Sequence, residues 1–265
     1  MECMCLKPYI FEETGDFAIV FKPPCMHCVP LKQKEGDTLF DWYAAVSPAI
    51  IDSGGGLVHR LDFETQGLVL FAKNQRSLDF LLEQQKEGNV IKEYSAMCQK
   101  APLCSSPFSD SFPPPPFTCV QEGAVIESFF RPFGPGRKQV RPVTDAAVNG
   151  KKIAARYEIA KDNNNYYRTT VMGVSGFPPD YCVFTVSLRR GFRHQIRCHL
   201  AWIGCPVLND PLYSTEPANG TSVNDGFLAL RANGLFFTDP QKGERDTAVG
   251  REYRIEAFRA SFTGF

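Results

Sequence analysis

The chain has no net charge, because 29 Lys and Arg residues among its 265 residues balance 29 Asp and Glu. Its whole-molecule field therefore gives no general attraction to polyanions, and any nucleic-acid contact must come from a local basic patch. It also lacks an apolar run of the roughly 18 to 20 residues that cross a membrane, and the basic and apolar segments of a signal peptide. Internal repeats and an oligomer-interface signal are absent too. We expect a cytoplasmic monomer without membrane association.

Cysteine is abundant, with ten residues, but a chain of this length without a signal peptide is expected to keep its thiols reduced. Cys3, Cys5, Cys25 and Cys28 raise the question of a metal site. Zinc sites of this kind pair two C-x-x-C motifs, whereas the first pair here is C-x-C at the chain end. We expect no metal and interpret these segments as loops that contain thiols.

Hydrophobic periodicity predicts many strands and about three helices. The helices are expected at residues 38–46, 77–87 and 194–203. The strands are expected at residues 17–21, 67–72, 90–98, 124–127, 154–160, 183–188, 228–232, 234–237 and 253–257. A proline-rich insertion falls near residues 101–117, a basic loop at 131–141 and a turn at 162–165. This order favours an α+β fold over a regular parallel βαβ array.

The helix expected at residues 194–203 carries cations where the helix dipole disfavours them. Arg193 and Arg197 lie one turn apart, as do Gln195 and His199, so two polar rows flank the apolar stripe. The unfavourable placement indicates an anionic partner for the arginines. Arginines on a solvated surface are the alternative.

Residues 57–73 place Asp62 between two apolar segments. Such a carboxylate is either a solvated turn residue or a partly desolvated, reactive group. Strand alternation over residues 90–98 puts Tyr94 on the same face as Lys92. A tyrosine in a strand is most often a packing residue, so these positions alone leave both interpretations open.

Four segments in this order resemble the RluA-type family of RNA pseudouridine synthases. They read FKPP at residues 21–24, HRLDFETQGLVLFAK at 59–73, KEY at 92–94 and HQIRCHLAWIGCPVLNDPLY at 194–213. The family pattern is approximately K-P-x-G, H-R-L-D-x-x-T-S-G-L-L-L-x-A-K, K-x-Y, G-R-T-H-Q-I-R-x-H-L and G-H-P-x-x-G-D-x-x-Y. The resemblance runs from about residue 17 to 257. It implies a mixed, largely antiparallel sheet core with a few flanking helices.

The resemblance also implies a reaction, the isomerisation of uridine to pseudouridine without metal or organic cofactor. Asp62 would be the catalytic carboxylate, Tyr94 would lie beneath the target base, and Arg197 would pair with the carboxylate. Asp62 would act either by attacking the sugar or base or by removing a ribose proton. The sequence does not choose between these two roles.

The substrate implied by the resemblance is structured RNA, either ribosomal or transfer RNA. The residues expected to contact RNA are Arg60, Arg190, Arg193, His194 and Gln195. We expect residues 1–16 to be an N-terminal extension and residues 17–265 to form the catalytic domain, without a separate N-terminal RNA-binding domain.

Several positions depart from the family pattern. Gln66 stands where Ser is usual, Phe192 and Arg193 where Arg and Thr are, Cys205 where His is, and Asn209 where Gly is. Gln66, Phe192 and Arg193 motivate an alternative function, an RNA-binding or folding module that keeps the scaffold and has lost turnover.

Overall fold

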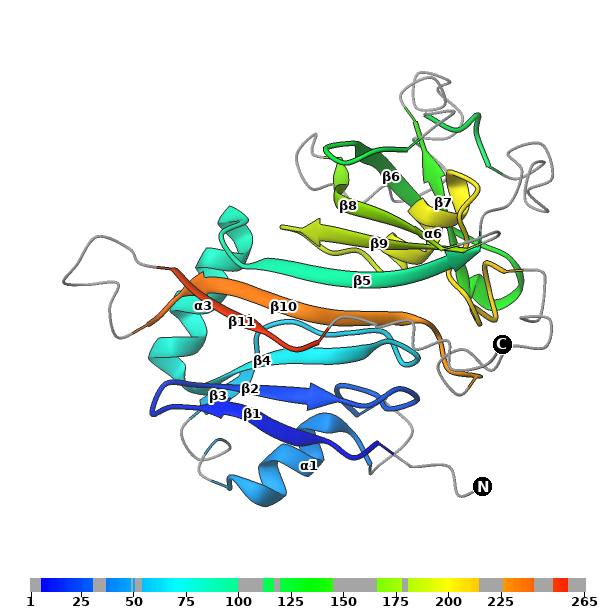
Figure 1. The fold of residues 1–265 in the computed structure, drawn as a ribbon. Coiled ribbons are helices and arrows are strands. Elements are labelled where there is room, and N and C mark those ends of the chain that lie inside the picture. Colours follow the sequence, from blue (N-terminus) through cyan, green and yellow to red (C-terminus); the bar gives the residue numbers. More distant parts are fainter. Residues whose placement is uncertain are drawn as a thin grey trace. The chain divides into compact units, whose positions relative to one another are not determined.

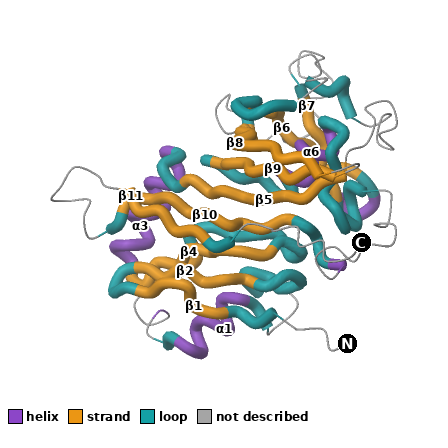
Figure 2. The backbone as a smooth tube through the Cα atoms, in the orientation of Figure 1, coloured by secondary structure: helices purple, strands orange, loops and turns teal. Residues whose placement is uncertain are grey.

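The computed structural model describes residues 6–30, 37–48, 50, 54–99, 112–116, 120–144, 166–177, 181–214, 226–240 and 250–256 (Figures 1 and 2). The chain divides into two compact units. Unit 1 contains Met1–Ser95 and Leu230–Phe265, and unit 2 contains Ala96–Ala229. Strand β5 (Ile91–Gln99) begins in unit 1 and ends in unit 2.

Unit 1 is a mixed sheet with helices. Its remaining elements are β1 (Tyr9–Glu13), β2 (Phe17–Lys22), α1 (Leu39–Val46), β3 (Gly54–Leu57), β4 (Gln66–Asn74), α3 (Gln75–Glu87), β10 (Leu230–Thr238) and β11 (Gly250–Arg254). Strands β1, β2, β4 and β10 lie in this order, β3 pairs with β4, and β11 pairs with β10. The β4–β10 pair is parallel, whereas β1–β2, β2–β4, β3–β4 and β10–β11 are antiparallel.

An apolar cluster holds unit 1 together. Side chains that alternate along β2 and β4, such as Ile19 and Leu70, pack with Leu81 of α3 and Phe237 of β10. Helix α3 begins at Asn74, whose side chain accepts a hydrogen bond from the amide of Ser77, and it ends at a left-handed glycine. Strand β4 is buried from its first residue, so it anchors the segment that precedes it, which contains Asp62.

Unit 2 is an antiparallel sheet with one helix among its described residues. Its elements are β6 (Val125–Phe133), the short 3₁₀ helix η2 (Pro135–Arg137), β7 (Gln139–Val143), β8 (Tyr167–Phe177), β9 (Tyr181–Leu188) and α6 (Gln195–Trp202). Strands β9, β8, β6 and β7 lie in this order, and each adjacent pair is antiparallel. The predicted α+β fold with a mixed, largely antiparallel sheet is confirmed.

Three local predictions were wrong. Residues 131–141 form most of a β-hairpin rather than a loop, because β6 continues to Phe133 and β7 starts at Gln139. The strands expected at 228–232 and 234–237 are the single strand β10, whose Gly234 stays in the ladder beside Arg254. Strands β1, β3 and β8 were not predicted.

Some expected features fall partly or wholly outside the described residues. They are the strand at 154–160, the turn at 162–165 and most of the proline-rich segment 101–117. In the part of the chain that the structure describes, no helix has the length and apolarity needed to cross a lipid bilayer.

Candidate active site

Asp62 lies in a tight turn that connects β3 to β4. The amide of Thr65 donates to the carbonyl oxygen of Asp62 over 3.2 Å, which closes the turn. Leu61 before it and Thr65 after it are buried, while the Asp62 side chain is half-buried. Asp and Thr suit such a turn because their side chains form local hydrogen bonds with the backbone. The carboxylate is thus held at the edge of the unit 1 core with part of its surface open.

Tyr94 is on the buried face of β5 and feels the charge of Asp62. Lys92 and Tyr94 are 4% and 6% exposed, whereas Ile91 and Glu93 are half-buried, as the predicted alternation requires. Burial raises the pKa of the Tyr94 hydroxyl, and the negative charge of Asp62 raises it further. Tyr94 is therefore a neutral phenol at physiological pH. The structure brings Asp62 and Tyr94 into one electrostatic neighbourhood within unit 1.

Lys22, at the end of β2, fixes the backbone of Phe63, the residue after Asp62. Its Nζ donates to the carbonyl oxygens of Pro23 (2.9 Å), Met26 (2.8 Å) and Phe63 (3.1 Å). The side chain is fully buried, and this burial lowers the pKa of Lys22 to about 8. Three carbonyl acceptors satisfy the three donors of an ammonium group, which makes a buried lysine tolerable here.

Cys28 fixes the backbone of Leu61, the residue before Asp62. The amide of Leu61 donates to Cys28 Sγ over 3.2 Å, and the thiol lies 3.5 Å from the carbonyl oxygen of Leu61, to which it donates. The ring of His27 packs on that of Phe63 with centroids 4.6 Å apart. The residues immediately before and after Asp62 are therefore both held by the 22–28 loop.

His59 connects the segment before Asp62 to β4. Its Nε2 accepts a hydrogen bond from the amide of Leu70 in β4 over 3.3 Å. Burial, with a smaller contribution from the Lys92 charge, lowers the pKa of His59 to about 3. The imidazole is neutral at physiological pH and ties the start of the Asp62 segment to the sheet.

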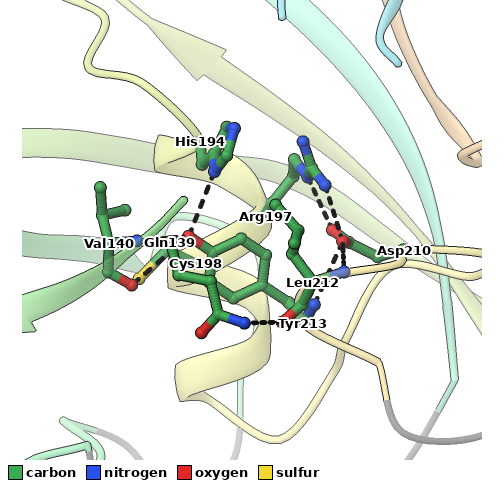
Figure 3. A network of polar contacts seen from close by, with 8 residues as sticks. All are labelled: Gln139, Val140, His194, Arg197, Cys198, Asp210, Leu212 and Tyr213. Carbon is green, nitrogen blue, oxygen red and sulfur yellow. Dashed lines mark hydrogen bonds and ion pairs between the residues drawn. The ribbon is translucent and has the colours of Figure 1, made fainter. Parts of the chain in front are cut away.

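Arg197 of α6 has a carboxylate partner inside unit 2 (Figure 3). Its Nε donates to Asp210 Oδ2 over 2.7 Å and its Nη2 to Asp210 Oδ1 over 2.8 Å, with both side chains fully buried. The amides of Leu212 and Tyr213 also donate to Asp210 Oδ1. The sequence indicated an anionic partner for the arginines at this helix start. For Arg197 that partner is Asp210 of the same chain. Asp62 belongs to unit 1, and its pairing with Arg197 stays a prediction.

The Tyr213 ring joins this ion pair to the β7 strand, as Figure 3 shows. The ring centroid lies 5.6 Å from the Arg197 guanidinium carbon, and the amide of Val140 donates to the Tyr213 hydroxyl over 2.8 Å. His194 Nδ1 lies 3.3 Å from the same hydroxyl. Burial lowers the pKa of His194 to about 3, so it is a neutral member of this network.

The residues expected to contact RNA differ in exposure. Arg60 and Arg193 are exposed, Arg190 is half-buried, and His194 and Gln195 are buried. The Gln195 side chain accepts from the amide of Phe192 and donates to Arg168 O and Thr169 Oγ1. Arg193 Nη2 donates to Arg137 O over 2.6 Å, in the turn of the β6–β7 hairpin. RNA contact by the five residues stays a prediction.

Three departures from the family pattern have structural roles. Gln66 is fully buried, and its Oε1 accepts from Arg231 Nη2 over 3.3 Å. Phe192 stacks on Phe130, with ring centroids 5.0 Å apart and an interplanar angle of 7°. Asn209 has φ +59°, a left-handed conformation in which Asn is the best substitute for Gly. Nothing in the structure explains Cys205.

Within the described residues, no three His, Cys, Asp or Glu side chains gather as metal ligands. Cys25 and Cys28 are described, whereas Cys3 and Cys5 lie outside the described residues. The question raised by the four cysteines is therefore open at the first pair.

Comparison with known proteins identifies the family. The sequence model described as RNA pseudouridylate synthase matches residues 16–202, more than half of the chain. The chain belongs to this family, and its curated relatives are of the RluA type.

The individual curated relatives match this chain at low sequence identity. Ribosomal large subunit pseudouridine synthase C of Rickettsia typhi is 29% identical over 203 residues, which are 76% of this chain and 52% of the relative. Synthase D of Haemophilus ducreyi is 26% identical over 246 residues, which are 89% of this chain and 64% of the relative. The chain thus spans between half and two-thirds of the length of these relatives.

A solved human structure, RNA pseudouridylate synthase domain containing 4, shares the fold. Its TM-score is 0.58 at 18% identity, with 94% of this chain and 88% of that chain covered.

Three site residues were missed from the sequence. Lys22 could have been found from the FKPP segment, and Asp210 from the NDPLY segment, since both belong to quoted motifs. Cys28 gave no signal beyond its C-x-x-C spacing, because its contact with Leu61 joins residues 33 positions apart.

Proposed function

We propose that the chain isomerises uridine in RNA to pseudouridine, with Asp62 as the catalytic carboxylate and Tyr94 as the residue beneath the base. The observation that carries the proposal is the electrostatic coupling of a half-buried carboxylate to a buried, neutral phenol within unit 1. Family membership over residues 16–202 supports the reaction type.

The chemistry requires a positioned carboxylate and a flat apolar support. The N1–C1′ bond of uridine breaks, the base rotates and C5 joins C1′. C5 then loses its proton to solvent and N1 takes up a proton, so the product is an isomer of the substrate. Asp62 serves either as the nucleophile or as the base that removes a ribose proton. A neutral Tyr94 adds no negative charge beside Asp62. Its aromatic ring can stack under a uracil that has been flipped out of the RNA.

The rigid backbone around Asp62 favours this role. Lys22 holds the carbonyl of Phe63, Cys28 holds the peptide of Leu61, and His59 holds the strand that follows. A catalytic group misplaced by about 1 Å can lose on the order of 100-fold in rate, so such support matters for turnover.

The proposed substrate is ribosomal RNA, with transfer RNA as the second choice. The two relatives described above are named for the large ribosomal subunit. Because the chain is neutral overall, we expect recognition by local cations such as the exposed Arg60 and Arg193, with modest salt dependence.

The inactive RNA-binding module loses much of its motivation. Gln66, Phe192 and Arg193, the departures that suggested it, have hydrogen-bond or ring partners in the same chain. None of these side chains therefore needs a lost catalytic step to account for it.

Mapping of pseudouridine tests the proposal. RNA from cells that lack the gene is incubated with purified protein, and the modified positions are read with and without enzyme. We expect one or a few uridines to convert with the wild type and none with Asp62→Ala. Conversion by Asp62→Ala, or no conversion of any RNA by the wild type, would refute it.

A further inference from the structure

Cys28, which forms a C-x-x-C pair with Cys25, joins the 22–28 loop to the Asp62 turn. Cys28 is 4% exposed, and its sulfur accepts from the amide of Leu61 and donates to the carbonyl of the same residue. Both polar groups of the residue before Asp62 thus depend on one reduced thiol. A sulfur bonded to another cysteine has no hydrogen to donate and a different position, so it cannot make both contacts.

Cys25 combines an exposed thiol with a backbone conformation that is unusual for cysteine. It is exposed, and its φ is +57°, in the left-handed region that favours glycine. The family pattern K-P-x-G places glycine at this position. A strained, accessible thiol three residues from the Cys28 contact indicates a use for the sulfur itself.

Positive charge lies beside the pair. The fully buried Lys22 interacts electrostatically with both Cys25 and Cys28, and its Nζ donates to the carbonyl of Met26, between the two cysteines. Burial raises the pKa of the Cys28 thiol, which keeps the reduced residue a protonated donor to Leu61. The Lys22 ammonium also holds Phe63, so the groups that fix both neighbours of Asp62 are in this loop.

We propose that Cys28 is a positioning residue for Asp62, and that a disulfide between Cys25 and Cys28 releases the Leu61 peptide and lowers turnover. The activity part rests on the proposed function, whereas the release of Leu61 does not. The device is a redox-sensitive contact, active with free thiols and inactive with the pair oxidised.

The oxidant is a low-molecular-weight disulfide such as glutathione disulfide. The thiolate of exposed Cys25 attacks one sulfur, the oxidant's S–S bond breaks, and one glutathione thiolate leaves. Cys28 then loses its proton to solvent and attacks the Cys25 sulfur of the mixed disulfide, which expels the second glutathione. Two cysteine thiols are oxidised by two electrons, and one disulfide is reduced to two thiols. A thiol reductant reverses both steps.

The experiment compares wild type with Cys25→Gly, Cys28→Ser and Cys28→Ala, each after dithiothreitol or glutathione disulfide. Glycine suits the left-handed φ at position 25 and removes the bonding partner. Serine keeps a donor and an acceptor for Leu61, and alanine keeps neither. Disulfides are mapped by differential alkylation and mass spectrometry, Leu61 by amide hydrogen exchange, and turnover by kcat and KM on the RNA found by pseudouridine mapping.

We expect oxidised wild type to contain the Cys25–Cys28 disulfide, to exchange the Leu61 amide at least about tenfold faster, and to lose on the order of 10- to 100-fold in kcat. KM should change less than about twofold, because the contact positions Asp62 and does not touch RNA. Reductant should restore kcat. Cys25→Gly should match reduced wild type in both conditions.

The two position-28 variants should differ under reducing conditions. Cys28→Ser should retain at least about half of the wild-type kcat and resist the oxidant, while Cys28→Ala should show the fast Leu61 exchange and the low kcat. Equal kcat for the serine, alanine and wild-type proteins would overturn the positioning role.

Other results overturn the redox part. They are the absence of a Cys25–Cys28 disulfide after oxidation, an unchanged Leu61 exchange in the disulfide form, or equal inactivation of wild type and Cys25→Gly. If reduced wild type has no activity on any RNA, the proposed function fails, and the exchange and disulfide measurements still decide whether oxidation releases Leu61.

Discussion

Replacing Asp210 with alanine removes the acceptor on which a fully buried arginine depends. Arg197 is bound through Nε and Nη2 at 2.7 and 2.8 Å, and both side chains have no exposed surface. The same carboxylate accepts from the amides of Leu212 and Tyr213. The alanine variant therefore leaves a guanidinium and two amides without their carboxylate acceptor.

The expected loss of stability is large. Breaking a buried ion pair by removing one partner typically costs about 3–5 kcal/mol. Each amide that loses its acceptor adds on the order of 1 kcal/mol. We therefore expect Asp210→Ala to lower the free energy of unfolding by about 5 kcal/mol. The exposed pair Arg168–Glu127, with side chains 67% and 44% exposed, gives a matched contrast, and Glu127→Ala should change it by less than about 1 kcal/mol.

Urea unfolding followed by the fluorescence of Trp202 measures the difference. Trp202 lies on α6 in the same unit, and a Trp42→Phe background isolates its signal, since the chain has two tryptophans. The double variant Arg197→Met/Asp210→Leu should recover more than half of the loss, because it removes the unpaired charge. A loss below about 1 kcal/mol for Asp210→Ala, or one equal to that of Glu127→Ala, would refute the reasoning.

Three further predictions concern stability. Burial lowers the pKa of His199 to about 3, so below about pH 6.5 the unfolded chain binds a proton that the folded chain does not. The free energy of unfolding therefore decreases as the pH is lowered. His199→Gln should flatten urea-measured stability between pH 6 and 4 by about 1.4 kcal/mol per pH unit. Gly67→Ala should abolish folding or lower the thermal midpoint by more than about 10 °C, because its Cβ would overlap the carbonyl oxygen of Ala232. The control Gly191→Ala meets nothing within 4 Å and should shift the midpoint by less than about 3 °C. Asn209→Ala should destabilise by about 1–2 kcal/mol in urea and Asn209→Gly by less than half of that, because glycine accepts φ +59°; an equal loss for both would contradict this explanation.

The Asp62 region was readable from the sequence because its signals are local. The apolar segments around Asp62 and the alternation around Tyr94 left their roles open, and the resemblance of the HRLD and KEY segments to the family pattern supplied the prediction of both as site residues. The buried face shared by Lys92 and Tyr94 follows from alternation alone. The electrostatic coupling of Asp62 to Tyr94 was beyond such reasoning, since it joins residues 32 positions apart in sequence.

The β6–β7 hairpin was misread because its strands carry charges. Arg141 is 2% exposed, and its guanidinium carbon lies 4.2 Å from the Phe133 ring centroid, so a cation that reads as a loop residue is a core residue. Likewise, Arg197 at a helix start predicted an anion, and the anion is Asp210 of the following turn. Periodicity records polarity, and it does not record which polar groups satisfy each other.

The most direct test of the central claim compares Asp62→Asn with Glu64→Gln on RNA that carries tritium at C5 of uridine. Both variants replace one half-buried acid of the same turn with its amide. Pseudouridine formation releases the C5 tritium, so the initial rate of release reports turnover. We predict that Asp62→Asn lowers the rate by at least about 1,000-fold, while Glu64→Gln stays within about threefold of wild type. Equal rates for Asp62→Asn and wild type would contradict the assignment of Asp62 as the catalytic carboxylate.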